Sequence, residues 1–294
     1  MQSLVSRHLL AASILLGASS FALALLAGVS VEAAVTASTV TTLLLAMLLE
    51  RLIPYRREWN SGRGDTGTDV ASAVVLVGVV DPLLKYFAPI LVILAYGHWS
   101  ERSSAASAFA HWNLGAQFAA VLLLAEFGRY WAHRAHHSLR PLWWLHAMHH
   151  SSERLYAVNN MRFHPLNYAI NFAAGVLPAM FLGFSAEALF AYMAITQPIL
   201  MLQHSNIDLK SGWLNYVVSS NEVHRWHHST EPTEANANFG NAIVLWDQLF
   251  GTFRAPGFPS QQNVGLFSES SSYPSRASYF AQLRSVFLPS CCDA

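Results

Sequence analysis

Charged side chains are scarce in this chain: Asp, Glu, Lys and Arg together make up 12% of its 294 residues, while 53% are hydrophobic. An ordinary soluble domain carries about 25% charged residues. This deficit argues against a typical soluble protein and indicates a chain that lies in a membrane. Basic and acidic residues balance at 17 each, so the sequence has no basic excess of the kind that nucleic-acid binding requires.

Cysteine is almost absent as well. The chain has only Cys291 and Cys292, which are adjacent and close to its end. Two neighbouring cysteines exclude an internal disulfide framework and a CxxC metal site. We interpret them as part of a tail, with lipidation of a membrane-proximal segment as the alternative.

Long apolar runs fill much of the first two thirds of the chain. A membrane helix needs about 20 apolar residues, whereas the apolar part of a signal peptide has about 7 to 15. We therefore expect the first run to be a retained helix, with a cleaved signal peptide as the alternative. The third run, one kinked span or two half-spans, carries Asp81 and Lys85 at a spacing that allows pairing on one helix face. The expected spans are residues 9–30, 33–49, 70–99, 103–125, 163–186 and 188–207.

Basic residues gather on one side of these spans. They follow the second, fourth and last spans, whereas the loop at 98–112 carries only Arg102. Because basic loops stay in the cytoplasm, we expect a cytoplasmic N-terminus and cytoplasmic histidine-rich segments. The sequence predicts an all-α fold: a polytopic membrane helical bundle with a cytoplasmic histidine-rich helical cap.

Histidine is abundant where charge is not, with 14 in the chain and dense groups at 133–150 and 224–228. Helix positions three or four apart share a face, so each group presents several imidazoles in one direction. Neutral imidazole suits iron, zinc, copper and nickel. Eight such residues exceed one tetrahedral site and predict two metal ions. The expected ligands, which are also the expected catalytic residues, are His133, His137, His146, His149, His150, His224, His227 and His228.

Two further histidines lie at the membrane edge. His164 begins the fifth span and His204 ends the sixth, so both are candidate ligands. The alternative for each is an interfacial anchor or a hydrogen-bond partner of a ligand. His136 is set aside because His137 makes the better pair with His133, four residues before it. The remaining histidines are expected to be solvated: His8, His98 and His111.

Carboxylates near these histidines are candidate supports, because a ligating histidine usually donates its other ring nitrogen to a carboxylate or a carbonyl. Glu126 lies two helical turns before His133 and on the same face. The alternative for Glu126 is a pair with Arg129 at the helix end. The expected partners are Glu126, Asp208, Glu222 and Asp247.

The histidine motifs belong to a longer ordered series. "EFGRYWAHRAHH", "LWWLHAMHHSSE", "RFHP", "QHSNI", "NEVHRWHHS" and "NFGNAIVLWDQLFGTF" follow one another between Glu126 and Phe253, and "ERLIPYR" and "GDTGTDV" precede them. This series resembles the fatty acid hydroxylase and sterol desaturase superfamily, the integral-membrane histidine-box di-iron oxygenases. The resemblance assigns the HxxxH and HxxHH histidines named above as iron ligands. One feature departs from it: some members carry a paired histidine motif before the last HxxHH, where this chain has His204 alone, with Leu200 four residues earlier.

The resemblance implies an activity, cofactors and partners. These are two Fe ions, O2 as co-substrate, and hydroxylation or desaturation of a membrane lipid C–H bond in lipid or sterol metabolism. No haem domain is expected in the chain, so electrons come from a separate cytochrome b5-like or ferredoxin-like protein. The expected divisions are membrane helices at residues 1–112, a catalytic domain of this superfamily at 113–255, and a C-terminal tail with partial order at most at 256–294.

Other function classes fit the residues less well. A membrane zinc hydrolase needs three protein ligands and a carboxylate base, and the chain lacks HExxH. A haem-binding or metal-transporting membrane protein needs its ligands or ionisable residues inside the bilayer, whereas the histidines are expected at the cytoplasmic ends of the spans.

Kinks at Pro178 and Pro198 are expected to open a slot for the lipid, with ordinary packing or lipid contact as the alternative. The candidates for lining it are Phe172, Met180, Phe181, Phe190, Tyr192 and Met201.

Overall fold

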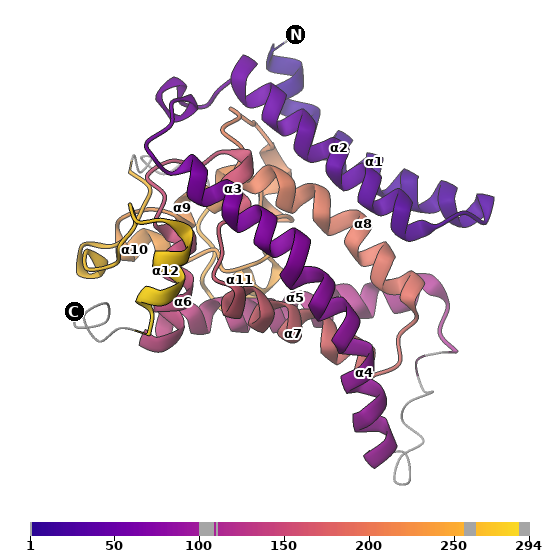
Figure 1. Ribbon diagram of the computed structural model, residues 1–294. Helices are drawn as coiled ribbons and strands as arrows, with labels where there is room; N and C mark the ends of the chain where they lie inside the picture. The colour runs from indigo at the N-terminus through magenta and orange to yellow at the C-terminus, as the bar shows by residue number, and fades with distance from the viewer. Residues whose placement is uncertain (1, 100–108, 110, 256–262, 288–294) are drawn as a thin grey trace.

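The computed structural model in Figure 1 describes residues 2–99, 109, 111–255 and 263–287. Within these ranges all regular elements are helices, and extended pairing is limited to isolated bridges such as Pro54 with Ile207. The predicted all-α class is confirmed. Cys291 and Cys292, the side chain of His98 and the loop around Arg102 lie outside the part that the structure describes.

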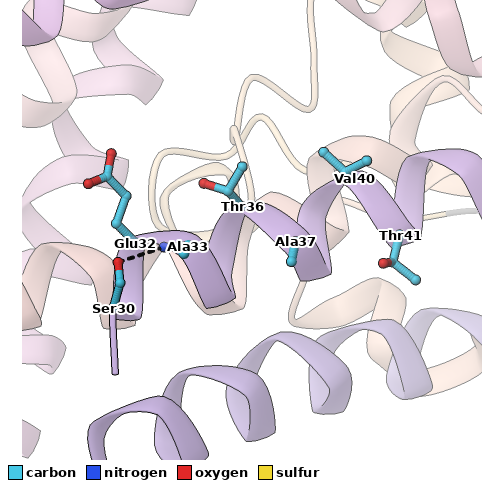
Figure 2. Close-up of a pocket in the computed structure, with 7 residues that line it drawn as sticks. All are labelled: Ser30, Glu32, Ala33, Thr36, Ala37, Val40 and Thr41. Atoms are coloured by element: carbon cyan, nitrogen blue, oxygen red, sulfur yellow. Dashed lines mark hydrogen bonds between the residues drawn. The ribbon is translucent and has the colours of Figure 1, made fainter. Parts of the chain in front are cut away.

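The first two helices form an antiparallel hairpin that packs along α8 (Figure 1). They are α1 (Gln2–Ala27) and α2 (Val31–Leu52), and α8 spans Ala186–Gln203. Ser30 caps α2 by accepting a hydrogen bond from the Ala33 N–H at 3.1 Å, as Figure 2 shows among the side chains on the outer face of this helix. Gly17 lets α1 approach α8 backbone to backbone, because a Cβ there would collide with the Ala194 carbonyl oxygen.

The third apolar run forms one continuous helical stretch. It consists of α3 (Thr66–Val75), a π-helical turn η2 (Leu76–Val80) and α4 (Asp81–Trp99). A π-turn is a common cause of a local distortion inside a helix. Lys85 pairs with Asp81 at 2.7 Å across one turn, as the spacing predicts, and the Tyr168 hydroxyl donates to the same carboxylate at 2.9 Å.

Three helical stretches are long and apolar enough to cross a membrane by length and composition: Gln2–Ala27, Val31–Leu52 and Thr66–Ala95. Three more spans are expected from the sequence, and their described parts fall mainly on α5 (Leu114–Ser138), α7 (Pro165–Phe181) and α8. Within the described residues these helices are not among the long apolar ones. α7 has only 17 residues, and the second half of α5 is histidine-rich because it reaches into the site.

The helices α5 and α7 pack very closely on each other. A Cβ at Gly128 of α5 would collide with the Ala174 carbonyl oxygen of α7. α7 continues through Pro178 and ends in a turn where Gly183 takes φ 74°, a left-handed conformation that glycine adopts without strain. Ser185 then caps α8 by accepting from the Ala188 N–H at 3.2 Å.

Short helices gather at one end of the long ones and form the cap (Figure 1). Their bounds are α6 (Arg140–His150), α9 (Asn221–His227), α10 (Pro232–Ala235), α11 (Leu245–Leu249) and α12 (Tyr279–Ser285), with 3-10 turns η1 (Arg57–Asn60), η4 (Ala157–Met161), η5 (Gly212–Tyr216) and η6 (Ser268–Ser270). The presence of a helical histidine-rich cap is as expected.

The C-terminal segment is more closely packed than its Ser- and Pro-rich composition indicates. Residues 263–287 lie against α6, where Tyr273 and Tyr279 join a buried cluster with Trp143, Trp144 and Met148. The Trp143 ring stacks on Phe267, and its Nε1–H donates to Ser270 Oγ at 2.8 Å. The aromatic residues of this segment make these packing contacts, which its largely polar composition does not indicate.

Candidate metal centre

Nine histidines meet in the cap and form two groups. Within each group, all candidate ligand atoms lie within 4.8 Å of one another. The first cluster contains His133, His137, His146, His150 and His227. The second cluster contains His149, His204, His224 and His228. All eight histidines of the three motifs are therefore brought together, and so is His204.

The HxxHH motifs divide between the two clusters in a regular way. His146 and His150, four residues apart on α6, share the first cluster, whereas His149 between them belongs to the second. At the end of α9 the arrangement is reversed. His224 and His228 belong to the second cluster, and His227 belongs to the first. Each motif thus supplies both clusters, because adjacent helix positions point about 100° apart.

Nitrogen atoms face one another inside both clusters. The Nε2 atoms of His133 and His146 are 3.0 Å apart, and those of His204 and His224 are 3.1 Å apart. Two ligands at adjacent corners of a coordination sphere with a metal–nitrogen distance of about 2.1 Å lie about 3 Å apart. These spacings fit ring nitrogens that converge on cations.

Oxygen acceptors fix the orientation of six rings from behind. The Nδ1 atoms of His133 and His227 lie 2.9 Å from the carbonyl oxygens of Phe239 and Ala237. The other four pairs are His149 Nδ1 with the Arg162 carbonyl, His146 Nδ1 with Asn167 Oδ1, His204 Nδ1 with Asn159 Oδ1, and His137 Nδ1 with Asn236 Oδ1. Because an Nδ1–H donates to each oxygen, Nε2 keeps its lone pair for the cluster.

Several buried ring nitrogens in the clusters have no hydrogen-bond partner among the described residues: His137 Nε2, His150 Nδ1, His224 Nδ1, His227 Nε2 and His228 Nδ1. A buried polar atom without a partner is costly unless something else satisfies it. These atoms belong to the same rings that converge at the two centres. The donor set therefore fits metal ions.

Burial keeps these imidazoles neutral. It lowers the pKa of His227 to about 3, and neighbouring imidazoles add to the effect. Burial likewise lowers the pKa of five more cluster histidines well below the ordinary value: His146, His149, His150, His224 and His228. A neutral imidazole has the free lone pair that a metal requires.

His164, a ligand candidate from the sequence, and His136 lie outside both clusters. His164 caps α7, where its Nδ1 accepts from the Leu166 N–H at 3.1 Å. His136 is fully buried next to the first cluster, with its Nε2 3.1 Å from Asn167 Nδ2. Because Asn167 also accepts from His146, His136 orients an amide that in turn orients a cluster ring. His8 and His111 are exposed.

The four carboxylates expected beside the ligands make no hydrogen bond to a cluster ring among the described residues. Glu126 accepts from the N–H groups of Ala242 and Ile243 and from the Tyr192 hydroxyl. It makes no ion pair with Arg129 in this part of the chain. Its role is to anchor the loop after Phe239, whose carbonyl contacts His133.

The other three carboxylates bond to backbone N–H groups or to a lysine. Asp247 accepts from the backbone N–H groups of Phe239 and Gly240, so it holds the same loop as Glu126. Glu222 accepts from the Ser211 N–H at 2.6 Å. Asp208 is partly exposed and pairs with Lys210 at 2.8 Å.

Buried ion pairs connect the upstream segment "GDTGTDV" to the site. Arg154 makes two 2.8 Å hydrogen bonds to Asp65. Arg162 pairs with Asp69 at 2.6 Å, and both side chains are almost completely buried. Arg162 also donates from Nε to the Met148 carbonyl at 3.0 Å. Since the Arg162 carbonyl contacts His149, this pair holds α3 against the second cluster.

Known proteins resemble this chain over the histidine-bearing region. The fatty acid hydroxylase family profile matches residues 118–252. The ornithine lipid hydroxylase OlsE of Rhizobium tropici is 33% identical over 231 residues, which cover 77% of this chain and 69% of that protein. The chain belongs to the fatty acid hydroxylase family.

Alkylglycerol monooxygenases are more distant relatives of this hydroxylase family member. The Homo sapiens enzyme is 25% identical over 151 residues, and the Xenopus tropicalis enzyme is 26% identical over 133 residues. The matches cover 49% and 45% of this chain but only 32% and 29% of those proteins. No solved structure matches the chain.

The region matched by the fatty acid hydroxylase family, residues 118–252, contains all nine cluster histidines. It also contains the asparagines that sequence reasoning missed: Asn159, Asn167 and Asn236. Asn167 offered a signal, as a polar residue one turn into an apolar helix that starts at "RFHP". For Asn159 and Asn236 the spacing gave no such signal, because they lie in irregular segments.

The six residues expected to line a substrate slot have different surroundings. Tyr192 is buried, and its hydroxyl donates to Glu126 at 2.7 Å. Phe190 packs with Phe21 and Val35, on the side of α8 that faces α1 and α2. Met201 is buried, Phe181 is 40% exposed, and Phe172 and Met180 are partly buried.

Proposed function

We propose that this protein is a membrane lipid hydroxylase that uses two iron ions and O2. Its membership of the fatty acid hydroxylase family and its relatives' names support a lipid substrate and a hydroxylation. The observation that carries the proposal is the pair of adjoining, all-histidine clusters. Each is rich enough in neutral imidazole nitrogen to hold one cation.

The two ion sites follow the two clusters. His133, His137, His146, His150 and His227 would hold one iron, and His149, His204, His224 and His228 would hold the other. Imidazole ligands alone do not select iron over zinc. The proposed reaction favours iron, because oxidation of an unactivated C–H bond needs a redox-active metal.

Iron bound there supplies the reduction of O2 and the cleavage of the C–H bond, which no side chain of this chain can perform. In the balanced reaction, a lipid C–H bond, O2, two electrons and two protons give a C–OH group and water. The electrons come from a separate carrier, either cytochrome b5-like or ferredoxin-like. The hydrogen bonds from Nδ1–H groups to backbone and amide oxygens hold the rings in the orientation that turns Nε2 toward the cluster.

The composition of the clusters favours oxidation over zinc hydrolysis. A hydrolytic zinc site pairs its metal-bound water with a nearby carboxylate base. The two clusters contain only histidines among the described residues, and the buried Glu126 and Asp247 are occupied by backbone N–H groups. The names of the relatives, hydroxylase and monooxygenase, favour hydroxylation over desaturation.

The position of the reaction follows from the membrane helices. The basic residues of the loops support a histidine cap on the cytoplasmic side of the membrane. A lipid can then enter from the bilayer with its polar part at the interface and its target carbon below the clusters.

Labelled oxygen gas tests the reaction. Membranes that contain the protein are incubated with host lipids, a reductant system and isotopically labelled O2, and the lipids are analysed by mass spectrometry. We expect a hydroxylated lipid that carries the label. A product whose oxygen comes from water, or that forms without O2, contradicts the proposal, and an unlabelled new double bond replaces hydroxylation with desaturation.

A further inference from the structure

Arg129 is a partly buried cation whose side chain lies between helices of the bundle. It lies on α5, four residues after the uncharged stretch that ends at Ala125. Its side chain is partly buried, and its Nε atom is covered and has no hydrogen-bond partner. Within the described residues the guanidinium makes no ion pair, and its one ring contact is with Tyr192, at 5.7 Å from the ring centroid.

The nearby carboxylates are already occupied. Glu126, one turn earlier on α5, receives hydrogen bonds from Tyr192 and from the N–H groups of Ala242 and Ile243. Asp81 is paired with Lys85. These hydrogen bonds come from neutral donors, so Glu126 remains an anion near Arg129, but among the described residues it accepts no hydrogen bond from the guanidinium. An ionisable side chain among apolar helices of a membrane protein is a candidate functional group by default.

The side chain of Arg129 lies between three helices. It extends from α5 over Gly175 of α7, where a Cβ atom would collide with its Nε, and it contacts the Tyr192 ring on α8. Glycine at 175 is what leaves room for the arginine. On α7, Asn171 Oδ1 is likewise buried without a hydrogen-bond partner among the described residues, one turn before Gly175 and on the same face.

These unpartnered groups lie close to the metal centre. Arg129 precedes His133 of the first cluster by four residues, or about 6 Å along a helix. On α7, Asn167 contacts His146, and Gly175 follows it by eight residues, or about 12 Å. A ligand group held by Arg129 therefore lies on the order of 10 Å from the clusters, at the membrane-facing end of the site.

We propose that Arg129 binds an anionic oxygen of the lipid substrate, a carboxylate or a phosphate, and so fixes which carbon reaches the clusters. Asn171 offers an acceptor to a hydroxyl or N–H group of the same polar region. The inference rests on the proposed function and narrows its substrate class to lipids that carry an anionic group near the oxidised carbon. A guanidinium is suited to this task, since its fork of N–H donors matches carboxylate and phosphate oxygens.

Binding of matched amphiphiles tests the inference without turnover. The purified full-length protein in detergent is titrated with hexadecanoate, hexadecyl phosphate and hexadecanol, which share one chain and differ in the polar end. A charge-assisted hydrogen bond predicts that at least one anion binds about ten- to a hundredfold more tightly than the alcohol. The stronger anion identifies the source of the oxygen as a carboxylate or a phosphate.

Three variants and one control assign the preference to this side chain. Arg129→Gln is expected to lose it, and Arg129→Lys to retain part of it. Gly175→Ala is expected to weaken it by displacing the arginine while the charge stays in the protein, which keeps the test valid if Arg129→Gln fails to fold. Arg140→Gln removes an exposed cation at the start of α6 and is expected to change nothing.

Equal binding of all three amphiphiles by the unaltered protein would overturn the inference. So would an anion preference that survives both Arg129→Gln and Gly175→Ala, or one that Arg140→Gln removes. Failure of the proposed function is seen separately, as the absence of O2-dependent hydroxylation in membranes. A protein that hydroxylates lipid but shows no anion preference keeps the function and loses this inference.

Discussion

The rings of His150 and His228 stack with their centroids 4.3 Å apart and an angle of 21° between their planes. One ring belongs to the first cluster and the other to the second. The two clusters are therefore in direct contact through the last histidine of each HxxHH motif. The HxxHH motif on α6 and the one that begins on α9 each give one cluster a pair of rings and the other a single ring.

Asn167 is expected to control metal binding in the first cluster, because His146 Nδ1 lies 2.8 Å from its Oδ1 atom. Asn167→Leu should weaken metal binding by about 10- to 100-fold, measured by competition with a chelator. Asn167→Asp keeps an acceptor and should bind close to the original affinity. Asn171→Leu, one turn along the same helix, is the control; an equal loss there would show that the effect is not specific to His146.

The buried pair of Arg162 and Asp69 is expected to be far more important for stability than an exposed pair. Arg162→Met leaves a buried carboxylate without its partner and should lower the free energy of unfolding by about 3–5 kcal/mol. Arg63→Met removes an exposed pair with Glu153 and should cost about 0–1 kcal/mol. Denaturant unfolding in detergent checks this, and similar costs for both variants would refute the assignment.

Acid is expected to destabilise the metal-free protein. Burial lowers the pKa of His227 to about 3 in the folded protein, from an ordinary value of 6.5. Between these values the unfolded chain binds more protons than the folded one, so stability falls as the pH decreases below about 6.5. Thermal melting of chelator-treated protein should show a midpoint that declines from pH 7 to pH 4. A midpoint that rises over this range would contradict buried, neutral imidazoles.

The charge asymmetry of the loops predicts the side on which the cap lies. In a background with both natural cysteines replaced by serine, Ser61→Cys and Ser271→Cys report on exposed positions next to the cap, and Val29→Cys reports on the turn between α1 and α2. An impermeant thiol reagent added to intact cells should label only Val29→Cys. Labelling of the two cap positions from outside would reverse the topology.

Much of the site was readable from the sequence, because helical spacing alone groups the eight motif histidines. Their division between clusters was not, since His149 and His150 are neighbours in the chain and belong to different clusters. The partners of the rings were also unexpected. The sequence points to carboxylates, but the folded chain uses carbonyl oxygens and asparagines, which only tertiary structure brings to the rings. Glu126 and Asp247 act one step away, on the loop that carries Phe239.

The two clusters should respond separately when one ligand is removed. His204→Ala takes a ring from the second cluster and leaves the first complete. We expect this variant to lose about half of its iron. His164→Ala removes a buried histidine that belongs to neither cluster and should keep the full amount, although the loss of a helix cap costs about 1 kcal/mol of stability.

The metal content of the unaltered protein is the decisive test of the two-iron proposal. Protein produced with adequate iron and purified in detergent is measured by elemental analysis against protein concentration. We expect two iron ions per chain, one for each histidine cluster. One metal ion per chain, or zinc in place of iron in protein that is active on lipid, would contradict it.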